Sequence, residues 1–312
     1  MESFQQYVAR CQPLPWTVVN EHPNEWLVGN FTLAINFVRC QLIMNEVKQY
    51  YSSNNTILDV GVYPGTMPQI FHEYYPGPGE YSYYGLGLGF DETFIKKMNE
   101  FGVELLECDL EPRLHLNAGR ETSIPLEEET VDLTIFTDVI EHFFDPFYPL
   151  QEINRVSKTG AVMILTTDNL TRFASLLALI RGQSCNVPLI EGNLFYTGDW
   201  RPHFREYSKG ELFQLLNWAG FEVLEHRFYE ADFGQYRVGG GQLFKKDQRQ
   251  LSVKGRLADE MRKIAIHIFP HLRDNHILVA RKVKPYEEML STAPNVVSDT
   301  GAWVSQRQAF RK

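Results

Sequence analysis

The sequence is poor in cysteine, and its four cysteines are widely separated. They stand at Cys11, Cys40, Cys108 and Cys185, and no two of them form a Cys-x-x-Cys pair. This spacing argues against a zinc ribbon and against the disulfide framework of a small secreted protein. We therefore expect a reducing, cytoplasmic environment.

Long apolar runs and an excess of positive charge are also missing. The longest apolar runs, FASLLALI and IAIHIF, are far shorter than the roughly 20 residues that cross a bilayer, and the stretch MESFQQYVARCQPLPW has no signal-peptide core. Lys and Arg number 30 against 39 Asp and Glu, which gives a formal net charge of -9. We expect no membrane insertion, and the acidic balance disfavours a nucleic acid as partner.

The pattern of apolar residues predicts an α/β protein with appendages. Residues 1–55 carry apolar positions at helical spacing, clearest in FTLAINFVRCQLIMNEVKQYY, and predict an N-terminal helical extension. Residues 56–284 alternate seven short apolar runs with helical stretches, which predicts a doubly wound, mostly parallel sheet. An insertion at about 170–202 is expected to form a substrate lid, and residues 285–312 a poorly ordered tail.

Two of the expected helices have recognisable ends. In YSKGELFQLLNWAGF, Ser208 and Glu211 have the spacing of a capping box, and Gly220 is placed to end the helix. The segment GRLADEMRKIAIHIFPHLRD predicts a further helix before the last apolar run, NHILVARK.

The first apolar run leads into a turn with the sequence ILDVGVYPGTM. An acid and two glycines after a strand are typical of the start of a nucleotide pocket. A dinucleotide fingerprint also requires a central glycine, where the backbone approaches the pyrophosphate, but Val62, Tyr63 and Pro64 fill that stretch. The turn therefore favours a ligand without a pyrophosphate.

Four segments, taken in order, carry a family resemblance. They are ILDVGVYPGT, VELLECDLE, the block from IPLEEETVDLTIFTDVIEHFF to TTDN, and HFREYSKGELFQLLNWAGFEV. Together they resemble class I S-adenosylmethionine-dependent methyltransferases over roughly residues 56–223. The resemblance implies the Rossmann-like methyltransferase fold, S-adenosylmethionine as cofactor, and methyl transfer by direct displacement to a hydroxyl of a small molecule or glycan precursor.

The resemblance also implies a set of cofactor contacts. Asp59 would lie near the ammonium group or organise the loop, and Asp109 would accept a hydrogen bond from the adenine amine. Gly87 stands where the family usually has the acid that binds the ribose, so that Asp91, or backbone and water, would have to replace it. The full expected set is Asp59, Gly61, Tyr63, Gly65, Gly87, Asp109, Leu110, Thr137 and Asp138.

The segment TDVIEHFFDP follows the fourth apolar run. Its spacing predicts that Asp138, Glu141 and His142 share one helical face, as a cluster for proton transfer or metal binding. Similar segments in ubiquinone-pathway O-methyltransferases and small-RNA 3′-end 2′-O-methyltransferases can hold a divalent metal, but the shorter Asp138 leaves the metal undetermined. The alternatives are a His142 that borders cofactor and substrate, and a structural helix start.

His142 and His203 are the expected catalytic residues. An alcohol must lose its proton during methylation, and histidine is the usual base near neutral pH. The alternative for His203 is a backbone contact at a lid hinge. Arg201 and Arg205 could bind an anionic group or remain solvated surface charges.

Three other functions remain open from the sequence. They are a nucleotide-sugar or NAD enzyme, a metal-dependent RNA 2′-O- or quinone-precursor O-methyltransferase, and a non-catalytic nucleotide or cofactor-binding protein. Neither the acceptor nor the oligomeric state follows from the residues. Phe195, Tyr196 and Trp200 could line an apolar pocket or stack on a sugar.

Overall fold

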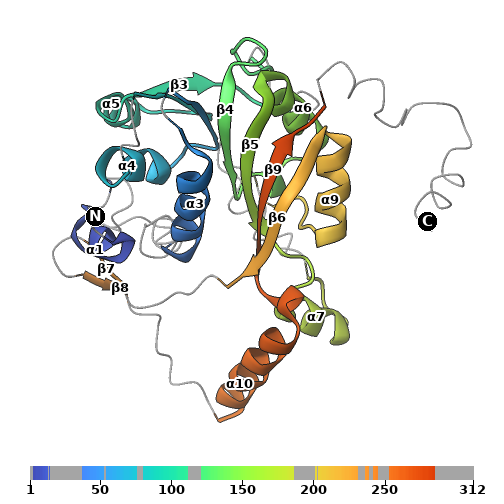
Figure 1. Cartoon of the computed structure of the whole chain (residues 1–312). Coiled ribbons are helices and arrows are strands. Elements are labelled where there is room, and N and C mark those ends of the chain that lie inside the picture. The colour runs from blue at the N-terminus through green and yellow to red at the C-terminus, as the bar shows by residue number, and fades with distance from the viewer. Residues whose placement is uncertain are drawn as a thin grey trace, which may run out of the picture.

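The core of the protein is a seven-stranded sheet with the order β3-β2-β1-β4-β5-β9-β6 (Figure 1). Strand β9 runs antiparallel to β5 and β6, and the other adjacent strands pair in parallel, so the predicted mostly parallel sheet is confirmed. The strands are β1 (Thr56–Val60), β2 (Ser82–Gly87), β3 (Val103–Glu107), β4 (Val131–Thr137), β5 (Ser157–Asp168), β6 (Phe221–Tyr229) and β9 (Asn275–Lys282). The computed structural model describes residues 3–12, 14, 37–52, 54–75, 80–111, 121–185, 201, 203–230, 236–238, 242–244 and 253–284.

Helices cover both faces of the sheet. One face packs against the N-terminal helices α1 (Phe4–Arg10) and α3 (Phe37–Tyr50), with α4 (Thr66–Glu73) and α5 (Glu92–Glu100). The other face packs against α6 (Phe147–Val156) and α9 (Lys209–Trp218). Neighbouring residues of β1 pack on opposite faces of the sheet: Ile57 lies in the core with α1, α3, α4 and α5, and Leu58 lies in the core with α6 and α9. Because both faces are buried, such a parallel strand appears in the sequence as a continuous apolar run.

The predicted ends of α9 are confirmed. The Ser208 hydroxyl accepts from the Glu211 amide, the Glu211 carboxylate accepts from the Ser208 amide, and Gly220 follows the helix with φ +84°. The other predicted helix is shorter than expected. Helix α10 (Val253–Ile268) stops before Pro270, because proline has no amide hydrogen to continue the ladder, and a 3-10 turn, η4 (Pro270–Leu272), follows.

Several other segments bear on the predicted organisation. Helix α7 (Phe173–Ile180) lies within the expected insertion. Strands β7 (Tyr236–Val238) and β8 (Gln242–Phe244) form a small antiparallel pair that the sequence did not predict. Residues 186–200, with Phe195, Tyr196 and Trp200, and the expected tail over 285–312 lie outside the described residues. In the described part of the chain, no helix is both long enough and apolar enough to cross a membrane.

The sheet positions the candidate site at its carboxyl edge. Strands β1 and β4 are neighbours, and the chain order reverses between them, which is where open α/β sheets bind their ligands. The residues that follow β1, β3, β4 and β5 therefore meet at one edge of the sheet.

Candidate functional site

The turn after β1 requires its two glycines. Gly61 and Gly65 have φ of +81° and +86°, and the amides of Gly61 and Val62 donate to the Leu86 carbonyl at 2.8 and 3.0 Å. A Cβ at Gly61 would lie 2.3 Å from a methyl carbon of Val139. The backbone of the turn at Gly61 thus lies directly against the segment that follows β4. The side chain of Tyr63, in the same turn, is half exposed.

Asp59 is a buried carboxyl at the end of β1. It accepts a hydrogen bond from the Tyr83 hydroxyl at 2.9 Å, and its side chain is almost fully buried. Burial raises the pKa of Asp59 to about 7, although the Tyr83 bond acts in the opposite direction. A cationic group placed beside Asp59 would favour its charged form.

Strand β2 ends at Gly87, where the family resemblance implies an acid that binds the ribose. A Cβ at Gly87 would lie 3.0 Å from two ring carbons of Phe90. Asp91 serves as the N-cap of α5 and accepts from the Phe94 amide at 2.8 Å. The exposed Glu107 pairs with Gly87 in the sheet and accepts from the Gly89 amide at 3.4 Å. Glu107, which the sequence analysis did not single out, is therefore the carboxylate of β3 that borders the end of β2.

The prediction that Asp138 shares a helical face with Glu141 and His142 was wrong. Asp138 has φ +51°, and the following 3-10 turn, η3, is limited to Ile140–His142. The carboxylate of Asp138 accepts from the Thr166 hydroxyl at 2.6 Å and forms an ion pair with Arg39 of α3. Thr137, the last residue of β4, is half-buried. Arg39 is a charged neighbour of this edge that the sequence analysis missed.

Asp109 and Leu110 follow β3 and are both buried. The two carboxylate oxygens of Asp109 accept from the guanidinium of Arg201 at 2.9 and 2.5 Å. Arg201 is only 9% exposed, so its interpretation as a solvated surface charge was wrong. Arg205, by contrast, is more than half exposed and forms an ion pair with Glu211.

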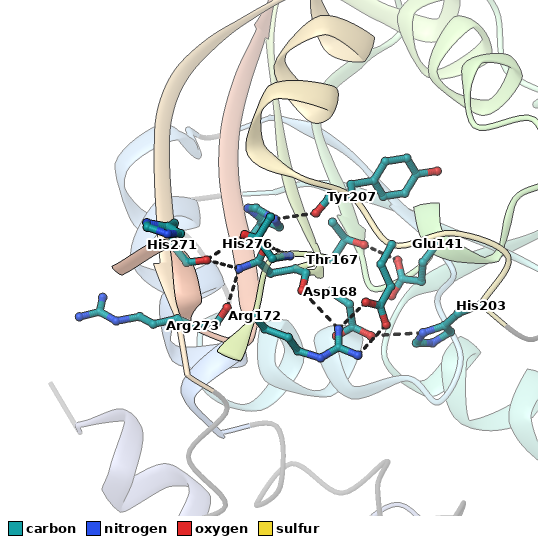
Figure 2. A network of polar contacts seen from close by, with 12 residues as sticks. Glu141, Thr167, Asp168, Arg172, His203, Tyr207, His271, Arg273 and His276 are labelled. Atoms are coloured by element: carbon teal, nitrogen blue, oxygen red, sulfur yellow. Dashed lines mark hydrogen bonds and ion pairs between the residues drawn. The ribbon is translucent and has the colours of Figure 1, made fainter. Parts of the chain in front are cut away.

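The two predicted catalytic histidines lie together. The rings of His142 and His203 have centroids 4.6 Å apart and are nearly perpendicular. His142 Nδ1 lies 2.5 Å from the backbone carbonyl of Arg201, and His203 Nδ1 lies 3.2 Å from Asp168 Oδ2 (Figure 2). The structure thus joins the segment after β4 to the segment before α9 and adds Asp168 at the end of β5.

The acids around His203 have shifted pKa values. Burial opposes a charge on His203, but the contact with the Asp168 carboxylate and the nearby Glu141 and Glu206 outweigh it and raise the pKa of His203. Burial also opposes a charge on Asp168, but His203 and Arg172 outweigh it and lower the pKa of Asp168. Burial raises the pKa of Glu141 to about 7, and the Thr167 hydroxyl donates to that carboxyl at 2.8 Å.

Arg172 neutralises part of this acidic group. Its guanidinium donates to both carboxylate oxygens of the buried Glu206, at 2.5 and 2.8 Å. Arg172 comes from the start of α7, so the pair links the insertion to the segment before α9. Figure 2 shows Arg172, Asp168, His203 and Glu141 gathered on one side of the sheet.

Among the residues that the structure describes, two groups of side chains could hold a cation. The ligand atoms of Glu141, His142 and His203 all lie within 4.8 Å of one another, and so do those of Asp168, His203 and Glu206. Asp138, which the sequence placed with the first group, belongs to neither. Imidazole and carboxylate ligands suit several divalent metals.

Part of the chain matches a known domain family. Residues 58–165 match the methyltransferase domain family. A Mycolicibacterium smegmatis protein named "Probable S-adenosylmethionine-dependent methyltransferase" is 32% identical over 112 residues, which are 36% of this chain and 37% of that protein. The match thus spans little more than a third of the length of the curated relative.

One solved structure shows the same fold. One chain of a complex between the Haloferax volcanii Trm112 methyltransferase activator and a candidate methyltransferase has a TM-score of 0.50 and 12% identity, and the match covers 86% of this chain and 100% of that chain. An Aquifex aeolicus S-adenosylmethionine-dependent methyltransferase has a TM-score of 0.42 and 17% identity, covering 77% and 89%. Residues 58–165 therefore match a methyltransferase domain, and the fold is that of the class I S-adenosylmethionine-dependent methyltransferases, whose cosubstrate is S-adenosylmethionine.

Proposed function

We propose that this protein transfers a methyl group from S-adenosylmethionine to a hydroxyl of a small molecule or glycan precursor. The observation that carries the proposal is the contact of His203 with Asp168 at the carboxyl edge of the sheet. The cosubstrate supplies a methyl group activated on a sulfonium centre, and the chain supplies alignment and a proton acceptor. The acceptor hydroxyl gives its proton to His203 as the oxygen–methyl bond forms, while the sulfur–methyl bond breaks and the demethylated thioether leaves.

Asp168 prepares His203 for this role. Asp168 Oδ2 lies 3.2 Å from His203 Nδ1, and a negative charge at this nitrogen favours a proton there, which leaves the lone pair of the neutral ring on Nε2. Asp168 also stabilises the imidazolium that forms when His203 takes the proton. His142 stands against His203 and would orient the acceptor.

The residues at the strand ends fit S-adenosylmethionine. Asp59 is a buried carboxyl whose partner is a hydroxyl rather than a cation, which suits the ammonium of the methionine part. Glu107 is a candidate for the ribose hydroxyls in place of an acid at Gly87, and Asp109 for the adenine amine. Backbone of Gly61 and Gly65 would contact the ligand, and the pocket would be completed by Tyr63, Leu110, Thr137 and Asp138.

Cofactor binding gives the first test. S-adenosylmethionine and its demethylated product, S-adenosylhomocysteine, are expected to bind, whereas NAD is not, because the turn after β1 lacks the glycine that admits a pyrophosphate. Isothermal titration calorimetry of all three ligands on one preparation measures this. Micromolar NAD binding without a response to either sulfur ligand would contradict the proposal, and sulfur-ligand binding without turnover on any hydroxyl acceptor would favour a non-catalytic binding protein.

A second candidate is a metal-dependent methyltransferase of the RNA 2′-O- or quinone-precursor type. The close approach of Glu141, His142 and His203 favours it. Two observations count against it. Arg172 already brings a cation to Glu206 beside Asp168, and the net charge of -9 is unfavourable for an RNA substrate.

Metal removal separates the two candidates. A chelator is expected to change turnover little, because His203 acts as the base through Asp168 without a metal. Turnover is measured as labelled methyl transferred from S-adenosylmethionine, before and after dialysis against chelator and after addition of Mg²⁺ or Mn²⁺. Complete loss that either ion restores would place the metal-dependent candidate first.

We further propose that residues 56–284 form the catalytic domain, with 1–55 as a helical extension, and that the protein works in the cytoplasm. The cysteine thiols support the cytoplasmic location. Cys11, Cys40 and Cys108 are free thiols and are buried. Free thiols suit a reducing compartment.

A further inference from the structure

One short segment contacts the residues that follow three different strands. We refer to the described residues of 201–207 as the edge segment. Its Arg201 pairs with Asp109 after β3, and its His203 contacts Asp168 at the end of β5. The amides of Phe204 and Arg205 donate to the Glu141 carbonyl after β4, at 2.8 and 3.4 Å. The edge segment thus runs across the carboxyl ends of β3, β4 and β5.

The first anchor of this segment is the pair formed by Arg201 and Asp109. Both side chains are almost fully buried, and the contact is bidentate, at 2.9 and 2.5 Å. Planar bidentate pairs fix the orientation of both groups. Losing one partner would leave the other charge buried without compensation, so the pair constrains where Arg201 can lie.

The backbone of Arg201 acts on the histidine pair. Its carbonyl lies 2.5 Å from His142 Nδ1, and the His142 ring packs edge-on against His203. A carbonyl can only accept a hydrogen bond, so His142 must carry its proton on Nδ1. A neutral histidine in water prefers the proton on Nε2, which means that the contact holds His142 in its less common form.

We propose that Arg201 is a positioning residue for the histidine pair. Asp109 fixes the guanidinium, and the carbonyl of Arg201 in turn fixes the tautomer and ring orientation of His142 beside His203. The role of this positioning in catalysis rests on the proposed function, whereas the effect of Arg201 on His142 does not depend on it. Because Asp109 is also the expected adenine partner, the adenine end of the cofactor pocket and His142 are linked through one arginine.

Histidine nitrogen spectra test the proposal without an acceptor. The side-chain ¹⁵N signals are recorded at about pH 8, where a histidine of ordinary pKa is neutral. His142 is assigned by the loss of its signals in His142→Gln. In the wild type, His142 Nδ1 should show the protonated form. In Arg201→Met and in Asp109→Asn it should move towards the unprotonated form, although Asp109 does not contact His142.

Arg205→Met is the matched control. Arg205 lies in the same edge segment, but its side chain is exposed and pairs with Glu211. This variant should leave the His142 signals as in the wild type. Arg201→Lys keeps one charge but not the bidentate contact and should give an intermediate spectrum. It also provides a milder test if Arg201→Met does not fold.

Unchanged His142 signals in a folded Arg201→Met or Asp109→Asn variant would overturn the inference. So would an equal change in Arg205→Met. Titration with S-adenosylhomocysteine separates this failure from a failure of the proposed function. If the His142 signals respond as expected but the wild type does not bind S-adenosylhomocysteine, the positioning role stands and the methyltransferase proposal fails.

Discussion

The His203→Gln variant is expected to lose methyl transfer by about 10²-fold or more, the usual scale for loss of a general base. Gln has no basic nitrogen, whereas His203 is held against Asp168 and surrounded by acids that favour its protonated state. Cofactor affinity should stay close to that of the wild type, because the proposed cofactor contacts lie at other residues. Labelled methyl transfer and calorimetry with S-adenosylhomocysteine measure the two quantities separately.

His142→Gln should show the same split, with lower turnover and nearly intact cofactor affinity. His271→Gln is the matched control, since His271 is exposed and its ring contacts Phe269. It should retain full turnover. If both His142→Gln and His203→Gln kept full turnover with the true acceptor, neither histidine would be catalytic, and the segment after β4 would be structural.

The pH profile gives an independent check on His203. Only the neutral ring can accept a proton, so kcat/KM should rise as pH increases through the pKa of His203, and this pKa is raised above its ordinary value of 6.5. Asp168→Asn removes a carboxylate that raises that pKa, so the rise should move to lower pH while the maximal rate falls. A rise at the same pH in the Asp168→Asn variant would show that another group is the base.

The fold could be predicted because its strands are buried on both faces. The strands Val131–Thr137 and Asn275–Lys282 are buried at nearly every position and carry apolar residues at about half of them, and the turns and caps that separate the strands from the helices have strong signals. Strand direction has no such signal. Nothing in NHILVARK distinguishes the antiparallel β9 from its parallel neighbours.

Site residues could be predicted from the sequence only where the residue type is uncommon at that position of the chain. Histidines near strand ends stood out, and the structure brings His142 and His203 together. Asp168 did not stand out, because an acid at the end of a strand has the same sequence signal as a surface acid. Its partner His203 comes from a distant segment. Asp138 was assigned to a helical face because spacing alone cannot show that its backbone has positive φ.

Asp59 is expected to contribute to the free energy of unfolding an amount that falls as pH rises from about 4 to 7, and Asp59→Asn should remove that contribution. The folded protein keeps a proton on Asp59 up to a pKa of about 7, whereas an unfolded chain releases it near its ordinary value of 3.8. Stability from this group is therefore complete below the lower value and is lost as pH rises through the higher one. We expect the variant to reduce the fall by about 1 to 4 kcal/mol.

Chemical denaturation at several pH values measures this effect. Glu141→Gln is a useful companion, because burial also raises the pKa of Glu141 to about 7 and it should account for a second share of the fall. The side-chain amide introduced by Asp59→Asn would still offer an oxygen to the Tyr83 hydroxyl, so the variant should fold. The same pH dependence in wild type and Asp59→Asn would show that Asp59 is already charged in the folded protein at neutral pH.

The same carboxyl connects stability to ligand binding. If the ammonium group of S-adenosylhomocysteine lies beside Asp59, it favours the charged carboxylate, so binding near pH 7 should release a fraction of a proton. The binding enthalpy should then depend on the ionisation enthalpy of the buffer. In Asp59→Asn this dependence should shrink and affinity should fall, because the amide cannot match the ammonium charge. Equal buffer dependence in both proteins would place the ammonium elsewhere and leave Asp59 as an organiser of the turn after β1.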